Sequence, residues 1–212
     1  MKKLIIPLII ATILVSGCTA VRINTSSIDN ITNILLSKEN NLYNRVGKGY
    51  TYYVPRGVTY IDTSDLNDKL YCDGNYYYLY VDAVSYYYGI KQDFTPDENA
   101  FYSKKIENGD KTGYLEINYN QKIDKYYIEF MYNYAKIEAI VSKYDINNTV
   151  MNASYILSTV KFNNEVIKLA IDENYYKSAE EKYDIFTIKK ETDDYQLKSE
   201  DSVDSTSSEG SE

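Results

Sequence analysis

Between Tyr50 and Val141 the sequence alternates apolar and polar residues in short segments, and this period of two most constrains the fold. Successive side chains of a strand point to opposite faces, so such alternation predicts strands with one buried face. The clearest segment is Tyr134–Val141. Its buried face would carry Ala135, Ile137, Ala139 and Val141. The pattern is typical of an antiparallel sheet that covers a core on one side.

Turn residues divide this region into about six to eight expected strands. Asn108-Gly109-Asp110 is a strong hairpin signal, and Pro55-Arg56-Gly57 has the chemistry of a turn that would pair the first two segments. We expect Gln92–Ala100, which contains Pro96, to be a loop. The expected strands are Tyr50–Val54, Val58–Asp62, Tyr76–Val81, Ala83–Ile90, Phe101–Glu107, Lys111–Tyr119, Lys125–Tyr132 and Tyr134–Val141.

Two segments have helical spacing instead. The first is expected over Ile28–Val46, with Ser27 as its N-cap. The second opens at Asp145, and its apolar stripe would consist of Ile146, Val150, Ala153, Leu157 and Val160. Lys161–Ala170 fits either a final strand or a short helix. The predicted fold class is α+β, an antiparallel sheet with an N-terminal and a C-terminal helix packed on it.

The first 18 residues have the parts of a bacterial export signal. Two lysines follow Met1, an apolar stretch runs from Leu4 to Val15, and the small residues Ser16 and Gly17 precede Cys18. A stretch of about 12 residues is too short to span a hydrocarbon core of about 30 Å as a helix. The segment therefore favours a cleaved signal peptide.

Val15-Ser16-Gly17-Cys18 resembles the lipobox of bacterial lipoproteins. The resemblance implies that residues 1–17 are removed and that Cys18 is acylated with diacylglycerol. It also implies a protein anchored by lipid, such as palmitate, on the extracytoplasmic face of the cell membrane. The alternative is an ordinary signal, or an uncleaved anchor, in which the cysteine occurs by chance.

The remaining chain is expected to contain one domain. Residues 18–27 would be a polar tether, residues 28–190 a single α+β domain, and residues 191–212 a disordered acidic tail. The tail has eight acidic residues and one lysine, and the whole chain has a net charge of −8. With most of the negative charge in the tail, the domain has no basic field for nucleic acid, so we predict no nucleic-acid partner.

The chain contains no histidine, which narrows the chemistry available to it. A Ser-His-Asp triad and His-ligated zinc are excluded, and we predict neither a metal site nor a cofactor. Cys72 would be the one thiol left after acylation of Cys18. We interpret it as a small buried hydrophobe rather than a nucleophile, because no histidine can lower its pKa.

Tyrosine occurs 26 times, beside five phenylalanines and no tryptophan. Strands accommodate tyrosine well, so most positions need no further explanation. Where exposed tyrosines cluster they can form a recognition surface. The predicted binding surface consists of Tyr76, Tyr78 and Tyr80 on one strand face, or Tyr86 and Tyr88 on the next strand.

Four carboxylates fall within or beside neighbouring expected strands: Glu116, Asp124, Glu129 and Glu138. A pair held about 5 to 9.5 Å apart could serve as acid and base, as in glycosidases. Because Lys111, Lys125 and Lys136 lie close in sequence, we favour cross-strand ion pairs on a solvated face.

The segment Tyr155–Asn163 resembles the closing helix of PsbP-like domains, which implies an antiparallel sheet with packed helices and no catalytic residues. The favoured function is that of a membrane-anchored lipoprotein with an extracytoplasmic binding or envelope-assembly domain. Envelope proteins are the first expected partners and cell-wall glycan is the second. The alternative is a carboxylate-dependent hydrolase of envelope polymers, so an enzyme is the less favoured interpretation.

Overall fold

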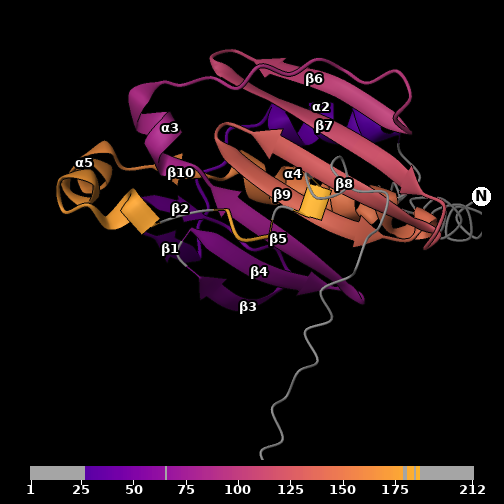
Figure 1. The fold of residues 1–212 in the computed structure, drawn as a ribbon, viewed down its shortest axis with the longest axis horizontal. Helices are drawn as coiled ribbons and strands as arrows, with labels where there is room; N and C mark the ends of the chain where they lie inside the picture. The colour runs from indigo at the N-terminus through magenta and orange to yellow at the C-terminus, as the bar shows by residue number, and fades with distance from the viewer. Residues whose placement is uncertain (1–26, 65, 179–180, 184, 187–212) are drawn as a thin grey trace, which may run out of the picture.

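The computed structural model describes residues 27–64, 66–178, 181–183 and 185–186 (Figure 1). The predicted signal peptide, Cys18, the tether before Ser27 and the acidic tail lie outside these residues. Their assignments therefore stay predictions. Within the described part of the chain, no helix has both the length and the apolar character needed to cross a membrane.

A seven-stranded sheet forms the centre of the fold, in the order β3-β4-β5-β9-β8-β7-β6 (Figure 1). All neighbouring strands in it are antiparallel. The strands are β3 (Thr59–Ser64), β4 (Asn67–Cys72), β5 (Asn75–Val81), β6 (Tyr102–Asn108), β7 (Lys111–Asn120), β8 (Lys125–Tyr132) and β9 (Ala135–Val141). The predicted α+β class and antiparallel sheet are confirmed.

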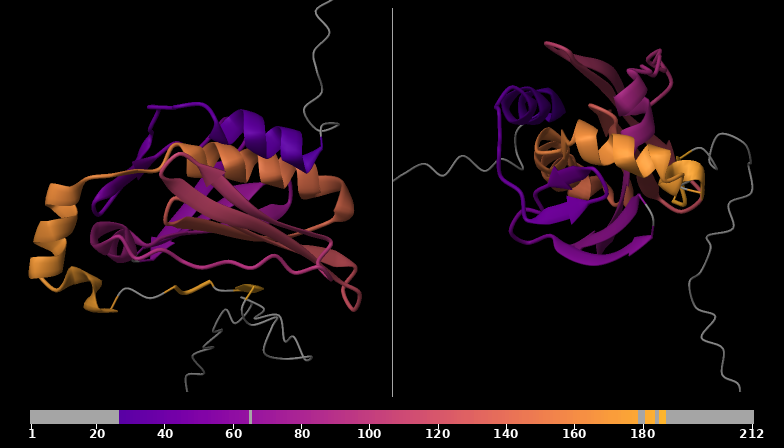
Figure 2. Two further views of the ribbon diagram at one scale, coloured as in Figure 1. Left: turned by 90° about the horizontal axis from the view of Figure 1, so that it is seen from above. Right: turned by 90° about the vertical axis from the view of Figure 1, so that its left-hand side faces the viewer.

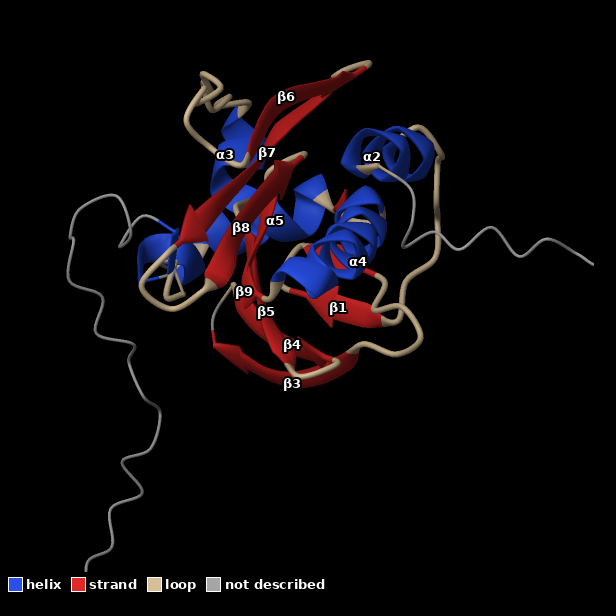
Figure 3. Cartoon of the chain, turned by 90° about the vertical axis from the view of Figure 1, so that its right-hand side faces the viewer, coloured by secondary structure: helices blue, strands red, loops and turns tan. Residues whose placement is uncertain are grey.

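The inner face of the sheet packs against helix α4 (Ile146–Ser158), and the sheet curves around this helix (Figure 3). The residues of the predicted stripe are all buried, although the helix ends at Ser158 and the last of them follows it: Ile146, Val150, Ala153, Leu157 and Val160. Facing it are the residues of β9 predicted to share one face: Ala135, Ile137, Ala139 and Val141. The helical spacing and the strand alternation in the sequence thus identified the two surfaces that form the core, one on α4 and one on β9.

Helix α4 follows a short 3-10 turn, η2 (Lys143–Asp145). Asp145 occupies the N-cap position, as predicted, but its side chain makes no capping hydrogen bond. Its carboxylate instead accepts a hydrogen bond of 2.7 Å from the Ser142 hydroxyl. The acidic side chain therefore stabilises the preceding turn.

Helix α2 (Ile28–Leu36) lies beside α4 on the inner side of the sheet (Figure 2). It begins as predicted, because the Ser27 hydroxyl accepts a hydrogen bond of 3.3 Å from the Asn30 N–H. The predicted end at Val46 is wrong. The Asn40 side chain accepts a hydrogen bond of 3.0 Å from the Leu42 N–H, and this local bond favours a turn over helix continuation.

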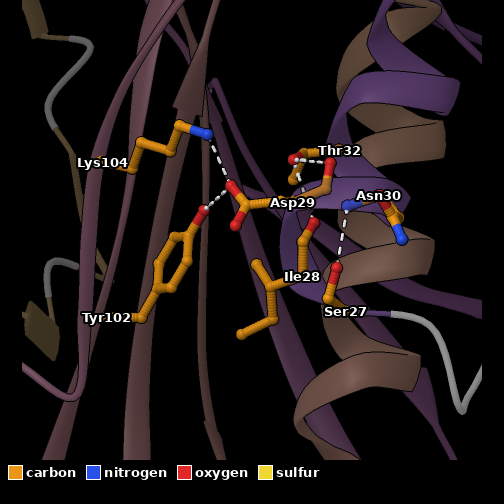
Figure 4. A network of polar contacts seen from close by, with 7 residues as sticks. All are labelled: Ser27, Ile28, Asp29, Asn30, Thr32, Tyr102 and Lys104. Atoms are coloured by element: carbon orange, nitrogen blue, oxygen red, sulfur yellow. Dashed lines mark hydrogen bonds and ion pairs between the residues drawn. The ribbon is translucent and has the colours of Figure 1, made fainter.

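A polar contact fixes α2 to the edge strand β6 (Figure 4). The Asp29 carboxylate accepts hydrogen bonds from Lys104 Nζ at 2.5 Å and from the Tyr102 hydroxyl at 3.1 Å. The bond from Lys104 holds the pKa of Asp29 below its usual value, although burial opposes this. The first turn of the helix is thus connected to a strand far away in the sequence.

The segment predicted as a strand over Ala83–Ile90 is a helix, α3 (Ala83–Tyr88). The Asp82 carboxylate accepts a hydrogen bond of 2.9 Å from the Ser85 N–H and caps its first turn. Gly89, at a φ of 65°, ends it in the left-handed conformation that glycine adopts readily. Capping at both ends therefore outweighs the preference of the tyrosine run for a strand.

A separate three-stranded sheet contains β1 (Arg45–Gly47), β2 (Tyr50–Tyr52) and β10 (Lys161–Phe162), in the order β1-β2-β10. The predicted pairing of the first two segments is wrong, since β2 pairs with β1 and β10 while β3 pairs with β4. Strand β4 escaped prediction because two of its buried positions carry polar residues, Asn67 and Asp68.

Both alternatives considered for Lys161–Ala170 occur in succession. The short strand β10 is followed by helix α5 (Asn164–Asp172) and the 3-10 helix η3 (Tyr175–Ser178). The Asn163 side chain caps α5 by accepting hydrogen bonds from Glu165 N–H and Val166 N–H at 3.1 and 3.2 Å.

Residues 181–183 and 185–186, called the C-terminal segment below, lie against part of the outer face of the sheet and contact β4, β5 and β9 (Figure 2). Tyr183 stacks on Tyr78 with ring centroids 4.6 Å apart, and Phe186 is buried. Tyr183 and Phe186 therefore hold this segment to the domain.

Candidate functional site

A cavity of about 480 Å³ lies where the small sheet meets the β3–β4 edge of the large sheet. This volume lies within the range of about 300–1,000 Å³ typical of small-molecule sites. Strands β1 and β2 form one wall, β3 and β4 another, and η3 closes one end. Its principal side chains are Arg45, Tyr50, Tyr52, Tyr60, Asp68 and Tyr175.

Asp68 is the buried polar centre of this cavity, with 4% of its surface exposed. One carboxylate oxygen accepts a hydrogen bond of 2.5 Å from the Tyr52 hydroxyl, and the other accepts one from the Thr63 hydroxyl. Because the Thr63 proton points to Asp68, the hydroxyl of Tyr60 donates to Thr63. Three hydroxyl side chains from two sheets are thereby oriented around one carboxylate.

A β-bulge in β3 makes this arrangement possible. Tyr60 pairs with Leu70 while Asp62 pairs with Lys69, so Ile61 is an extra residue in the register. In a regular strand, residues three apart face opposite sides, but an extra residue restores them to the same side. Tyr60 and Thr63 therefore both face the cavity.

Burial and the neighbouring carboxylate suppress ionisation of the cavity tyrosines. Burial raises the pKa of Tyr52 well above its usual range, and the charge of Asp68 raises it further. The same two causes, in the same order, raise the pKa of Tyr50. At physiological pH both phenols are therefore neutral hydrogen-bond donors.

Two cations lie against aromatic rings at the rim. The guanidinium of Arg45 lies 3.6 Å from the centroid of the Tyr60 ring, and Lys48 Nζ lies 5.2 Å from that of Tyr175. Lys48 also forms a long, exposed ion pair with Glu173, at 3.8 Å. Since Asp68 is the one acidic side chain in the lining, the cavity carries a net positive charge.

Gly47 is required for the close packing of this wall. A Cβ atom at this position would lie 2.2 Å from Cζ of Tyr50. The Tyr50 ring can therefore cross β1 only because residue 47 has no side chain.

The predicted carboxylates form a second polar region, on the outer face of the large sheet. Glu129 lies directly opposite Glu116 on β7 and directly opposite Glu138 on β9. The three side chains are 2%, 6% and 1% exposed for Glu116, Glu129 and Glu138 respectively. The predicted solvated face is therefore wrong for these three residues, because other groups cover it. The predicted ion pairing with Lys136 occurs at Glu138, although both residues lie on β9 rather than on neighbouring strands.

Hydroxyl and amide groups satisfy two of these glutamates. The Tyr114 hydroxyl donates to Glu129, and its ring stacks on Phe94 with centroids 4.1 Å apart. Glu116 accepts hydrogen bonds from the Ser103 hydroxyl at 3.2 Å and from the Asn118 amide at 2.9 Å. The loop that carries Phe94 thus helps to exclude water from the row.

Glu138 connects the row to the C-terminal segment. Its carboxylate lies 3.1 Å from Lys136 Nζ and accepts a hydrogen bond of 2.6 Å from the Ile185 N–H. Lys136 forms a second ion pair, at 2.6 Å, with Glu181 of the C-terminal segment. Burial raises the pKa of Glu138 to about 8, although Lys136 opposes the shift. Burial lowers the pKa of Lys136, but the surrounding carboxylates outweigh it and raise that pKa above its usual value.

Asp124 is separate from this row and lies in the turn between β7 and β8. It accepts a hydrogen bond of 2.9 Å from the exposed Tyr119 hydroxyl. Among the described residues, no group of three or more acidic or cysteine side chains is placed to hold a metal ion.

The first group of predicted surface tyrosines shares one face of β5, as alternation requires, but it is only partly accessible. Tyr76 is 44% exposed and contacts Tyr71, whereas Tyr78 lies under Tyr183. Tyr80 is half-buried, and burial raises its pKa to about 12.

The second group lies on helix α3, so its predicted position on a strand is wrong. Tyr86 is enclosed by Phe162 and Tyr134, with ring centroids 3.8 and 5.6 Å away. Tyr88 is 60% exposed. The five tyrosines therefore do not form one continuous surface, and a binding role for Tyr76 and Tyr88 stays a prediction.

Cys72 is a free, buried cysteine on β4, as we interpreted it. Burial raises the pKa of its thiol, and the neighbouring charge of Asp73 adds to this effect. The side chain is therefore a poor nucleophile at neutral pH.

Comparison with protein-family models, with curated proteins and with solved structures finds no match to this chain. The resemblances to lipoproteins and to PsbP-like domains stay predictions from short motifs. Sequence reasoning missed the cavity because its residues are spread from Arg45 to Tyr175 and lack a common motif.

Proposed function

We propose that this protein is a lipid-anchored binding protein of the cell envelope. In this proposal Cys18 carries the lipid, and the α+β domain stands outside the cytoplasmic membrane. The domain binds an envelope component in the tyrosine-lined cavity. The observation that carries the binding part is a cavity of about 480 Å³ in which the buried Asp68 orients the hydroxyls of Tyr52 and Thr63, and Thr63 in turn orients that of Tyr60.

The anchor contributes by confinement. Two acyl chains hold a protein on a membrane stably, at about 0.8 kcal/mol for each buried methylene group. A tethered domain then meets neighbouring envelope molecules at an effective concentration set by the reach of its tether. Modest affinity in the cavity is sufficient under these conditions.

The shape of the site favours a small polar ligand over a protein surface. Tyrosine rings with oriented hydroxyls are suited to a sugar, which has apolar ring faces and many hydroxyl groups. Cell-wall glycan therefore becomes the first candidate and an envelope protein the second.

The alternative of a carboxylate-dependent hydrolase has weaker support. Glu116, Glu129 and Glu138 lie side by side, but none of them lines the cavity. The C-terminal segment and the Phe94 loop cover them, so a polymer substrate has no visible path to the row. Hydrolysis of envelope polymers that is lost in Glu129→Gln would restore this alternative.

The location is tested by growing cells with a labelled fatty acid. We expect label in the wild-type protein and none in Cys18→Ala, which should accumulate as an uncleaved or soluble precursor. Equal labelling of both proteins would contradict the anchor.

Binding is tested by sedimenting isolated envelopes with the purified full-length protein in detergent. Tyr60→Ala opens one cavity wall and should reduce sedimentation. Tyr144→Ala is the matched control, because Tyr144 is 96% exposed and lies outside the cavity. Equal sedimentation of the two variants would contradict binding in the cavity.

A further inference from the structure

We infer that the cavity recognises an anionic saccharide, meaning a sugar ring that carries a carboxylate or a phosphate. This inference deepens the proposed function and rests on its assignment of the cavity as the binding site. It is carried by the juxtaposition of two groups: the guanidinium of Arg45, which lies over the Tyr60 ring, and the carboxylate of Asp68, which accepts hydrogen bonds from the Tyr52 and Thr63 hydroxyls.

Arg45 provides the anion-binding group. Its guanidinium lies 3.6 Å from the Tyr60 centroid, and no ion pair to it is found in the described part of the chain. A contact with the face of a ring uses none of the N–H groups of a guanidinium as hydrogen-bond donors to oxygen, so these donors are available to a ligand. Two such donors at one edge of the group match a carboxylate or phosphate in a two-pronged arrangement.

Lys48 strengthens the preference for negative charge. Its ammonium lies at the same rim, against Tyr175, and its ion pair with Glu173 is long and solvent-exposed. An exposed pair of this kind contributes little, so Lys48 can turn to a ligand with little loss. Two cations at the rim favour a ligand with net negative charge over a zwitterion such as an amino acid.

Asp68 provides the site for sugar hydroxyls. Each of its oxygens accepts one hydrogen bond from the protein, and a carboxylate oxygen has room for a second. A ligand hydroxyl can donate there without displacing Tyr52 or Thr63. The charge of Asp68 would repel an anionic group of the ligand. The ligand would therefore bind with its anionic group towards Arg45 and its hydroxyls towards Asp68.

The inference is tested by calorimetric titration of the full-length protein in detergent. The probes are glucuronate, glucose 6-phosphate, glucose, alanine and inorganic phosphate. We expect glucuronate or glucose 6-phosphate to bind at least about tenfold more tightly than glucose, because charge-assisted hydrogen bonds are the strong ones. Whichever of the two binds more tightly identifies the anionic group as a carboxylate or a phosphate.

Variants connect this preference to the cavity. Arg45→Gln should weaken binding of the charged sugar by about 10- to 100-fold, the range expected for loss of hydrogen bonds from a charged group. Arg45→Lys should bind between wild type and Arg45→Gln, because lysine keeps the charge but loses the planar fork. The matched control is Arg56→Gln, which changes an exposed arginine outside the cavity.

Lys48→Gln gives a second measurement of how a rim cation contributes to binding of the charged sugar. The Lys48 side chain is exposed, so this substitution does not threaten folding. The inference is overturned if no sugar binds, if glucose or alanine binds as tightly as the charged sugars, or if inorganic phosphate alone is equivalent to glucose 6-phosphate. If charged-sugar binding is absent while the results of envelope sedimentation and lipid labelling are as expected, this inference is rejected and the proposed function stands. Failure of those two assays, with charged-sugar binding retained, would instead reject the proposed location and partner.

Discussion

The buried Glu138 should make the stability of the domain depend on pH in an unusual direction. Its pKa rises from 4.5 to about 8 in the fold, so the native state holds its proton more tightly than the unfolded chain does. The resulting stabilisation is complete below about pH 4.5 and is lost as the pH rises through 8. One pKa unit corresponds to about 1.4 kcal/mol, so the change is on the order of 5 kcal/mol.

Glu138→Gln isolates this contribution, because glutamine has no proton to lose. An amide oxygen can still accept the hydrogen bond that Ile185 N–H donates at 2.6 Å. We expect the variant to gain stability relative to wild type as the pH rises from 4.5 to 9, by about 5 kcal/mol in total.

Urea unfolding at several pH values measures this difference, with Cys18→Ala present in every protein to remove the predicted acylation site. Glu107→Gln is the control, since Glu107 is an exposed carboxylate on β6 that pairs with Lys105. Its difference from wild type should stay nearly constant. A constant difference for Glu138→Gln over the same pH range would refute the reasoning.

Four further outcomes are expected. Gly113→Ala should lower stability by about 1–3 kcal/mol, because the new Cβ would lie 2.1 Å from the Met131 carbonyl oxygen; an unchanged melting temperature would contradict this. Asn163→Ala should cost about 1 kcal/mol by removing the cap of α5, and urea unfolding would detect it. In a Cys18→Ala background, Cys72 should react with a thiol reagent far more slowly in the native protein than in urea, and equal rates would show an accessible thiol. Removing residues 191–212 should leave the melting temperature almost unchanged, whereas a drop of many degrees would show that the tail is docked.

The sequence predicted the parts of the fold whose signal is local. Tyr134–Val141 alternates and forms β9, which begins one residue later at Ala135 and buries Ala135, Ile137, Ala139 and Val141. The stripe that begins at Ile146 identified α4 because each of its residues meets the same core. In both cases the hydrophobic period and the buried face coincide.

The failures have a different physical origin. Asp82 and Gly89 cap a helix in a tyrosine-rich segment whose composition favours a strand, so local hydrogen bonds decide the structure. The burial of Glu116 and Glu138 depends on covering groups distant in the sequence. The cavity likewise depends on packing between two sheets, which a single-segment pattern does not encode.

The way in which the extra residue Ile61 is accommodated in β3 affects the cavity but not the core of the domain. Ile61 lies on β3, an edge strand of the sheet, and its side chain is exposed. Deleting this residue would leave Tyr60 and Thr63 two residues apart in a regular strand, so both would still face the cavity and the hydroxyl relay would keep its partners. Pairing Ile61 in regular register without a deletion would instead turn Thr63 to the opposite side. The edge strand can therefore lose one residue without losing the site, whereas a shift in its pairing would abolish the relay in a domain whose helices and central strands are unchanged.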